Sequence, residues 1–346
     1  MQYKAFSPTP PGSRKVILAT NIAETSVTVP GVRFVIDCGL QKRRKFNAQL
    51  GIETLQIHPI SKSSAAQRAG RAGREAPGKC FRLYPSTHFT SFAESTTPEI
   101  RDCDLTSLVL TLKIQGHDDI LNFPFLDRPK RESVMRSLEI LYLLGAIGND
   151  GKPTEVGKQM NQLPLAPELA KVLLSSAGGE ANCAAEVIDI IACMTASTAS
   201  SNAIFLTPNA EKREETMENR KHFASATGDH ITLLQAFQEY QSVLKAGNNG
   251  GSAIKEWCQR WGINRRVLKN VLEVQKQLLG YCERNSIPVT PAERPDKDAI
   301  LKAFLSGYVM NTAILQKDGS YRTTFSHHVF HSSDDVLTLD CGHPSF

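Results

Sequence analysis

Three arginines recur at every third position of residues 67–74, which read Gln-Arg-Ala-Gly-Arg-Ala-Gly-Arg. Residues three apart share one face of a helix. Arginine binds phosphate well because its guanidinium group is planar, permanently charged and rich in hydrogen-bond donors. The small residues between the arginines let a ligand approach closely. The pattern therefore predicts a phosphate-facing cluster. The alternative is a basic amphipathic helix that lies on nucleic acid or is simply solvated.

Small hydroxyl and amide side chains gather in a second segment, residues 20–26, which reads Thr-Asn-Ile-Ala-Glu-Thr-Ser. It follows residues 14–19, a short run with an apolar centre that predicts a buried parallel strand. Ligands of parallel sheets bind at the carboxyl ends of strands, and this segment has such a position. A short helix capped by the same side chains is an equally good interpretation.

Further strands and a helix are expected around these two segments. Alternation and turn residues predict strands at residues 33–37 and 79–84, a β-hairpin over residues 40–57, and a helix at residues 61–73. Strands that alternate with short helices indicate an α/β lobe ending near residue 116. The first arm of the hairpin carries four consecutive bases, which fit a phosphate grip or a solvated face: Lys42, Arg43, Arg44 and Lys45.

Beyond residue 116 the pattern becomes mainly helical. Apolar residues recur at helical spacing over residues 134–145, a turn follows at residues 149–151, and Thr154 begins another helix. These short helices around a tight turn predict a winged-helix-like module. Helical patterns then dominate as far as Arg284, and the chain ends with one more helix and a few strand-like segments that have little sheet to pair with.

The net charge of +5 is unevenly distributed. Residues 1–90 carry 14 Lys or Arg against four acids, so this part is at +10 and the rest of the chain at −5. A basic N-terminal part suggests phosphate or nucleic acid as its partner. The sequence contains no apolar run of about 18 residues, which argues against a membrane span, and its first residues lack the apolar core of a signal peptide.

No metal site is predicted. The eight cysteines are scattered and form no Cys-x-x-Cys pair, which fits reduced thiols in the cytosol or nucleus. His327, His328 and His331 are interpreted as a surface cluster, because no acid or cysteine completes a ligand set. Residues 73–80 nearly match a phosphate loop, but the expected order of helix and strand is reversed and Cys80 replaces the hydroxyl that binds magnesium.

Residues 19–26 followed by residues 67–74 resemble the fifth and sixth motifs of DEAH/RHA-type RNA helicases, in the right order and with a hairpin between them. The likeness covers roughly residues 1–325, and the tail after Ser326 stops matching. It implies a multidomain α/β plus α fold with four modules: a second RecA-like parallel-sheet lobe (residues 1–116, incomplete at its N-terminus), a winged helix (117–185), a helical ratchet bundle (186–290) and a truncated OB-like β-barrel (291–346).

The resemblance also implies roles at the ATP site. Gln67 would help to position the attacking water, and Arg71 and Arg74 would act as arginine fingers on the γ-phosphate of ATP, where charge develops during phosphoryl transfer. Ser26 would belong to the nucleotide side of the site, and Asp37 would reach the ribose. Arg68 is expected to be structural or nearer the RNA.

The remaining implied roles concern RNA. Thr20 and Asn21 would contact its backbone, and Thr25, together with Ser26, would couple that contact to the nucleotide cleft. The hairpin that carries Lys42–Lys45 would wedge against the incoming duplex. Contacts to sugar and phosphate bind RNA with little dependence on its sequence.

The resemblance implies the C-terminal half of an ATP-dependent RNA helicase that uses ATP with Mg²⁺. No Asp-Glu dipeptide occurs in the sequence, so the DEAH motif and the Mg²⁺ site are expected on a first lobe that this chain lacks, and the chain alone is expected to be inactive. The expected partners are RNA and a glycine-patch activator protein, with no membrane, in the nucleus or cytoplasm. The alternatives are a non-catalytic RNA-binding or adaptor fragment and a DNA-unwinding relative.

Overall fold

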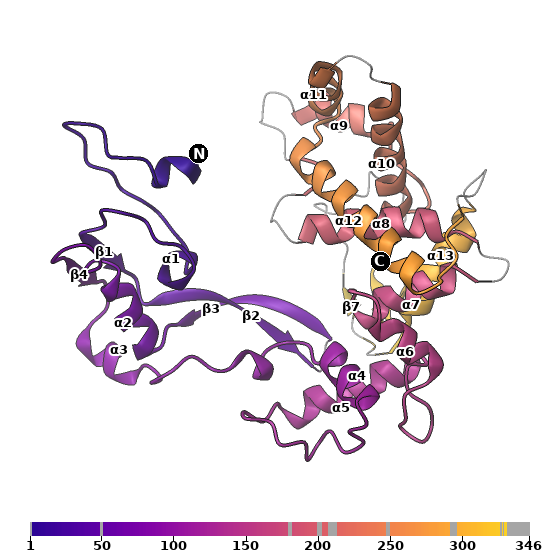
Figure 1. Cartoon of the computed structure of the whole chain (residues 1–346), viewed down its shortest axis with the longest axis horizontal. Coiled ribbons are helices and arrows are strands. Elements are labelled where there is room, and N and C mark those ends of the chain that lie inside the picture. Colours follow the sequence, from indigo (N-terminus) through magenta and orange to yellow (C-terminus); the bar gives the residue numbers. More distant parts are fainter. Residues whose placement is uncertain are drawn as a thin grey trace. The chain divides into compact units, whose positions relative to one another are not determined.

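The computed structural model describes residues 2–48, 51–178, 182–198, 203–206, 213–246, 250–290, 296–325, 327 and 329–330. The chain divides into two compact units (Figure 1). The first unit comprises Met1–Leu105 and Leu121–Arg136, and the second comprises Thr106–Ile120 and Ser137–Phe346. The finer division into four modules stays a prediction.

A small parallel sheet positions the two polar segments of the first unit. Strand β1 (Phe34–Asp37) pairs with β4 (Lys79–Arg82), with Phe34 opposite Lys79 and Asp37 opposite Arg82. Helix α2 (Lys62–Gly70) packs against β1 and against the one-turn helix α1 (Ile22–Thr25). The predicted strands at residues 33–37 and 79–84 and the helix between them are therefore confirmed.

The strand predicted at residues 14–19 is wrong. This segment has no regular secondary structure, and Val16 and Leu18 are 77% and 96% exposed. A strand forms only where its backbone groups pair with a neighbour, and β1 pairs only with β4 among the described strands. Lys15 instead donates to the carbonyl oxygens of Ala5 and Ser7, at 2.9 and 2.6 Å. The apolar run therefore lacks the pairing that would make it a strand.

The predicted hairpin is confirmed and forms the long two-stranded ribbon in Figure 1. Strand β2 (Leu40–Asn47) pairs antiparallel with β3 (Ile52–Pro59), from Leu40 opposite Pro59 to Asn47 opposite Ile52. Gly51 adopts a φ of 69°, which glycine reaches without strain. The Phe46 amide donates to the carbonyl oxygen of Asp102 at 2.7 Å, so the hairpin is tied to a later part of the same unit.

Short helices connect these strands to the rest of the chain. Thr154 begins a helix as predicted, because its hydroxyl accepts the Gly157 amide at 3.0 Å. Besides α1 and α2, the helices that the structure describes before residue 165 are η1 (Gln2–Ala5), α3 (Ser86–Ser91), η2 (Glu99–Arg101), α4 (Thr106–Ile114), α5 (Arg131–Leu143) and α6 (Glu155–Asn161).

The second unit is built mainly from packed helices, as the sequence predicted. Its apolar side chains meet where α8 packs against α10 and α12, and α7 packs against α13. Val187, Ile188 and Phe237 are fully buried in this unit. The helices are α7 (Pro167–Ser176), α8 (Ala184–Thr198), α9 (Arg213–Arg220), α10 (Asp229–Ala246), α11 (Gly250–Trp261), α12 (Arg265–Arg284) and α13 (Lys297–Gly307).

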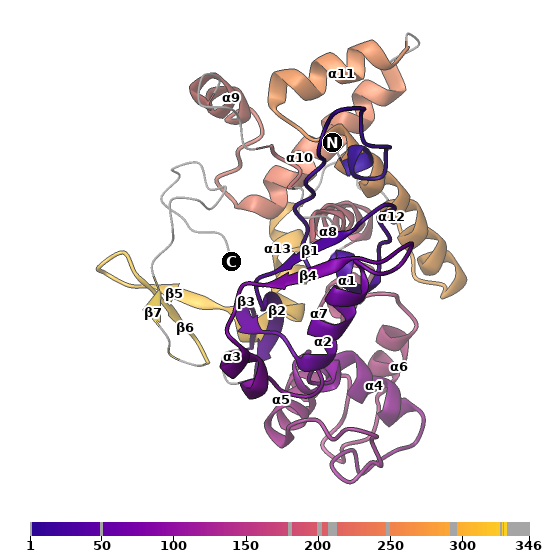
Figure 2. The same cartoon turned by 90° about the vertical axis from the view of Figure 1, so that its left-hand side faces the viewer.

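A small antiparallel sheet ends the described chain. After η4 (Val309–Asn311) come β5 (Ala313–Leu315), β6 (Tyr321–Thr323) and β7 (Val329–Phe330), paired in that order. Figure 2 shows them as a short open ribbon, and no other described strand closes it into a barrel. The structure therefore establishes a three-stranded sheet in this region, and the OB-like barrel stays a prediction. His328, His331 and the tail after residue 330 lie outside the described residues.

Candidate functional site

The arginine segment begins as an α-helix and ends in a tighter turn. Ser61 caps α2, because its hydroxyl accepts the Ser64 amide at 3.1 Å. The α-helix stops at Gly70, earlier than the predicted end at residue 73, and the next three amides bond to carbonyls three residues back at 3.1–3.3 Å. Residues three apart eclipse one another in such a turn. The arginines therefore stay on one side after the α-helix ends.

All three arginines contact the stretch of chain between Glu24 and Thr28. The Nε of Arg68 lies 2.9 Å from Oε2 of Glu24, the Nε of Arg71 donates to the Glu24 carbonyl oxygen at 2.6 Å, and Nη1 of Arg74 donates to the Thr28 hydroxyl. The structure thus brings together two motifs that lie more than 40 residues apart in the sequence.

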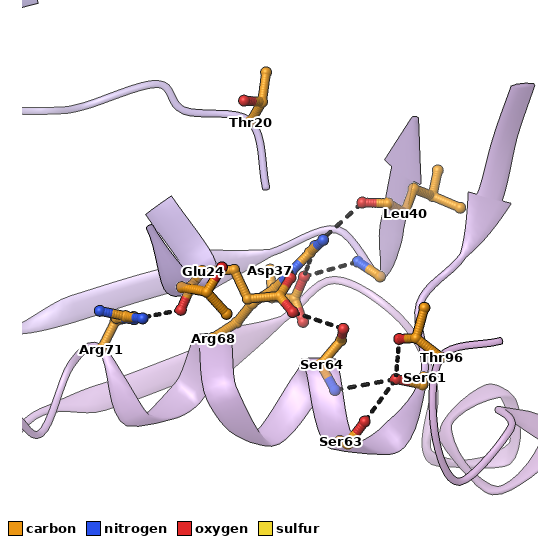
Figure 3. A network of polar contacts seen from close by, with 12 residues as sticks. Thr20, Glu24, Asp37, Leu40, Ser61, Ser63, Ser64, Arg68, Arg71 and Thr96 are labelled. Carbon is orange, nitrogen blue, oxygen red and sulfur yellow. Dashed lines mark hydrogen bonds and ion pairs between the residues drawn. The ribbon is translucent and has the colours of Figure 1, made fainter. Parts of the chain in front are cut away.

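Arg68 lies at the centre of this network (Figure 3). Its guanidinium forms ion pairs with Glu24 and Asp37, both at 2.9 Å, and donates to the Leu40 carbonyl oxygen at 3.1 Å. The Arg68, Glu24 and Asp37 side chains are only 14%, 10% and 0% exposed. Burial lowers the pKa of Arg68, but the hydrogen bonds and charges of the two carboxylates outweigh it and the pKa is raised. Arg68 is therefore a structural residue.

Asp37 is occupied within the protein. Its Oδ1 accepts from Arg68 and from the Gly39 amide at 3.0 Å, and its Oδ2 accepts from the Tyr84 hydroxyl at 3.0 Å. Burial, followed by the bond to Asp37, raises the pKa of Tyr84 to about 12, so its hydroxyl remains a donor. The ribose contact of Asp37 stays a prediction, and the Asp37 side chain has no exposed surface in this structure.

The last two arginines of the segment differ in exposure. Nη1 of Arg71 is buried and has no hydrogen-bond partner among the described residues, whereas Gln67 and Arg74 are exposed. A Cβ added to Gly70 would meet no atom within 4 Å, and one added to Gly73 would meet only a backbone oxygen at 4.0 Å. The surface between the arginines is therefore open, as a group with acceptor oxygens requires.

The predicted RNA-contact residues lie on the same stretch as Glu24. Thr20, Asn21, Thr25 and Ser26 are all exposed. This stretch forms the one-turn helix α1, yet Asn21 at its N-cap makes no side-chain capping bond, and the Thr20 hydroxyl accepts from the Ile22 amide only at 3.5 Å. In Figure 3, Thr20 lies outside the drawn network. These polar side chains are therefore largely available to a ligand.

The four hairpin bases divide by environment. Arg43 forms an ion pair with Asp102 at 2.8 Å and also donates to the Thr97 carbonyl oxygen. Lys42 and Arg44 are exposed, Lys45 is half-buried, and Arg44 lies 3.7 Å from Glu53, which is also exposed. The charge of Arg43 is thus used inside the first unit, whereas its neighbours face solvent.

Sequence reasoning missed Glu24 and Ser64 as members of this network. The Ser64 hydroxyl donates to Oε1 of Glu24 at 2.6 Å, beside the Arg68 contact. One signal was available: Glu24 is one of only four acids in the basic first 90 residues, and it sits among small polar residues. A carboxylate in that setting indicates a specific cationic or hydroxyl partner.

The described ranges also bear on metal sites, disulfides and membrane spans. In these, no group of three or more His, Cys, Asp or Glu side chains is arranged to hold a metal ion. Seven cysteines belong to the described residues, and each is a free thiol. No described helix is long and apolar enough to cross a membrane.

Three family models match this chain. Residues 2–76 match the helicase conserved C-terminal domain, residues 137–165 the winged-helix helicase-associated domain HA2, and residues 166–233 the ratchet-like part of that domain. The first match contains both segments of the network, from Thr20 to Arg74.

Two curated relatives align with almost the whole chain. The pre-mRNA-splicing factor ATP-dependent RNA helicase DEAH10 of Arabidopsis thaliana is 41% identical over 337 residues, which are 95% of this chain and 46% of that protein. The probable ATP-dependent RNA helicase DHR2 of Saccharomyces cerevisiae is 40% identical over 334 residues, 93% of this chain and 44% of that protein. The chain spans about half the length of these relatives. By its domains and these relatives, the chain belongs to the DEAH-type RNA helicases and corresponds to their C-terminal part.

Proposed function

We propose that this chain is the C-terminal half of an ATP-dependent RNA helicase. Its arginine segment completes an ATP site whose phosphate loop and Mg²⁺ ligands lie on a preceding lobe. One observation carries the proposal: Nη1 of Arg71 is buried and has no hydrogen-bond partner among the described residues, next to an exposed Arg74 and to two glycines with open space around them. Both relatives have names that describe ATP-dependent RNA helicases.

In the proposed reaction, this chain's residues stabilise charge and orient water. Phosphoryl transfer spreads negative charge over the γ-phosphate oxygens, and guanidinium donors held in place stabilise that charge. Arg71 and Arg74 supply these donors, and the exposed Gln67 orients the attacking water. Mg²⁺ bound with ATP on the first lobe neutralises the phosphates when present. Ser26 completes the nucleotide side.

RNA binds along the exposed polar residues of the first unit. Thr20, Asn21 and Thr25 contact its backbone, and the hairpin separates the duplex. Lys42, Arg44 and Lys45 make the hairpin's phosphate contacts, whereas Arg43 holds the hairpin in place through Asp102. Arg43 is set apart because its guanidinium already forms an ion pair within the first unit.

The first unit is completed by further chain. Phe34, Ile36 and Phe81 on the paired strands are half or more exposed, and strands of parallel sheets are ordinarily covered on both faces.

Three further proposals rest on the sequence resemblance. They are a partial OB-like fold over residues 291–346, a glycine-patch activator protein as partner, and a nuclear or cytoplasmic location.

The test uses a two-lobed protein, in which a helicase lobe with a phosphate loop precedes residues 1–346. Arg71→Ala and Arg74→Ala should each abolish its RNA-stimulated ATP hydrolysis. Arg14→Ala, which changes an exposed arginine of the same unit, should have no effect. Unchanged turnover in both finger variants would refute the assignment. Unwinding of matched RNA and DNA duplexes by the unaltered protein then separates an RNA helicase from a DNA-unwinding relative.

A second candidate function is that of a non-catalytic RNA-binding or adaptor module. The absence of a phosphate loop and of any Asp-Glu dipeptide in this sequence favours it. The two-lobed protein distinguishes the candidates, because an adaptor binds RNA without any RNA-stimulated turnover of ATP.

A further inference from the structure

Glu24 joins the RNA-contact stretch to the arginine segment by three bonds. Its Oε1 accepts the Ser64 hydroxyl at 2.6 Å, its Oε2 accepts Nε of Arg68 at 2.9 Å, and its carbonyl oxygen accepts Nε of Arg71 at 2.6 Å. All three donors belong to α2 or the turn that follows it. Figure 3 shows the Glu24 side chain lying over this helix, with Arg71 reaching its backbone.

The carboxylate bonds fix α1 against α2. Both oxygens are engaged, one with a cation and one with a hydroxyl, and bonds to an ionised group are shorter and stronger than neutral ones. The side chain is only 10% exposed, so water cannot easily replace either donor. A movement of α1 therefore moves α2 or breaks two buried bonds.

The backbone bond sets the direction of Arg71. The Glu24 carbonyl holds Nε of this side chain, and Nη1 of the same guanidinium is left buried without a partner among the described residues. Because a guanidinium is rigid and planar, the position of the Glu24 carbonyl determines where the free donor points. A shift of the backbone at residue 24 therefore re-aims that donor.

The RNA side of the link is the same stretch of chain. Thr25, a predicted RNA contact, follows Glu24 directly in the chain. The hydroxyls of Thr25 and Ser26 contact each other at 3.4 Å, whereas the Glu24 side chain bonds to α2. We infer that Glu24, rather than its hydroxyl neighbours, is the positioning residue that transmits RNA contact to the Arg71 guanidinium. This inference rests on the proposed ATPase function. It assigns Glu24 no contact with RNA, ATP or the reacting atoms.

The chemistry of the position favours glutamate. A glutamine has the same length but carries an NH₂ group in place of one oxygen. With the amide oxygen toward Nε of Arg68, the NH₂ group faces Oγ of Ser64, which can accept as well as donate. The variant therefore keeps the size and the contacts of the side chain but loses the negative charge that pairs with Arg68. Glu24→Gln therefore weakens the link and preserves the volume of the side chain. Glu94→Gln is the matched control, because Glu94 bonds Lys62 of the same helix at 2.6 Å but is 83% exposed.

The experiment measures ATP turnover of the two-lobed protein with and without single-stranded RNA. Glu24→Gln should lower the RNA-stimulated kcat by about 5- to 100-fold, the range of typical couplings between sites. The unstimulated rate, the KM for ATP and the Kd for RNA should change less than about twofold, because the residues that contact ATP and RNA remain. Glu94→Gln should match the unaltered protein.

A milder variant separates positioning from folding. Ser64→Ala removes one hydroxyl bond and should lower RNA stimulation partially, and the double variant should be no worse than Glu24→Gln alone, because both changes break one link. Full RNA stimulation in Glu24→Gln and Ser64→Ala, or an equal loss of the stimulated and unstimulated rates, would overturn the inference alone. An unaltered two-lobed protein that shows no RNA-stimulated turnover would overturn the proposed function, and this inference with it.

Discussion

Different interactions stabilise the interior of each of the two units. The second unit buries apolar side chains completely where α8, α10 and α12 pack. In the first unit the paired strands expose Phe34, Ile36 and Phe81, and its most buried charged group is the Asp37 carboxylate. The second unit therefore depends on apolar packing, whereas the described part of the first depends on a network of charges. A charge network is directional, so it can hold functional groups in place but offers little stability by itself.

The largest expected effect comes from one substitution made in both units. Phe237 on α10 is fully buried, and Phe34 on β1 is 65% exposed. Phe237→Ala should lower the free energy of unfolding by about 3–5 kcal/mol through lost burial and a cavity, and Phe34→Ala by about 1 kcal/mol or less. Denaturant unfolding measures both values. Equal losses would contradict the contrast between the units.

The next effect tests the charge network. Arg68→Ala leaves the Asp37 carboxylate, which has no exposed surface, with fewer partners, so the free energy of unfolding should fall by about 3 kcal/mol. Lys62→Ala, a change on the same helix that breaks the pair between Lys62 and the 83% exposed Glu94, should cost about 1 kcal/mol or less. Thermal unfolding of the two variants compares them, and a neutral Arg68→Ala would mean that the network carries no stability.

A buried acid in the second unit predicts a pH effect. Burial raises the pKa of Asp189 to about 7, with Glu186 also raising it and Gln275 and Lys245 lowering it. Because the folded pKa lies above the unfolded one, the charged form destabilises the fold above pH 7, and this penalty disappears as the pH falls toward 4.

Asp189→Asn should therefore raise the free energy of unfolding at pH 8 by about 1–3 kcal/mol. The amide oxygen can still accept the Gln275 bond. The gain should shrink steadily toward pH 4. Urea titrations at several pH values check this, and a gain that is independent of pH would show that ionisation is not its cause.

The smallest effects separate two neighbours on the hairpin. Arg43→Ala breaks the half-buried pair with Asp102 and should cost about 1–2 kcal/mol of stability. Arg44→Ala changes an exposed side chain and should cost less than about 0.5 kcal/mol, but it should reduce the salt dependence of RNA binding by about one unit of slope. Thermal unfolding and RNA titrations at three salt concentrations test the pair. If Arg44→Ala lowered stability and Arg43→Ala lowered the salt dependence of RNA binding, the proposed roles of the two arginines would be contradicted.

The sequence predicted the local elements of the site well. The spacing of Arg68, Arg71 and Arg74 predicted a common side, and the alternation around Gly51 predicted the hairpin, because both depend on neighbours in the chain. The prediction of a strand at residues 14–19 was wrong because a strand needs a pairing partner, and the apolar character of a segment does not show whether one is present.

The role of Glu24 could not be predicted for a similar reason. Its partners lie 40 and 44 residues away, and only the packing of α1 on α2 brings them together. The same packing shows that the Asp37 carboxylate is engaged by Arg68 and Tyr84, whereas the resemblance alone assigned it to the nucleotide. The sequence alone was therefore enough to predict the family, whereas the roles of individual residues depend on contacts that only the structure shows.

Above all, we propose that this chain supplies half of a composite ATP site. The most direct measurement compares ATP hydrolysis, in the presence of RNA, by three proteins: residues 1–346 alone, a phosphate-loop lobe alone, and the two joined in one chain. If the site is composite, RNA-stimulated turnover should occur only in the joined protein. RNA-stimulated turnover by residues 1–346 alone, abolished by Arg74→Ala, would contradict this proposal.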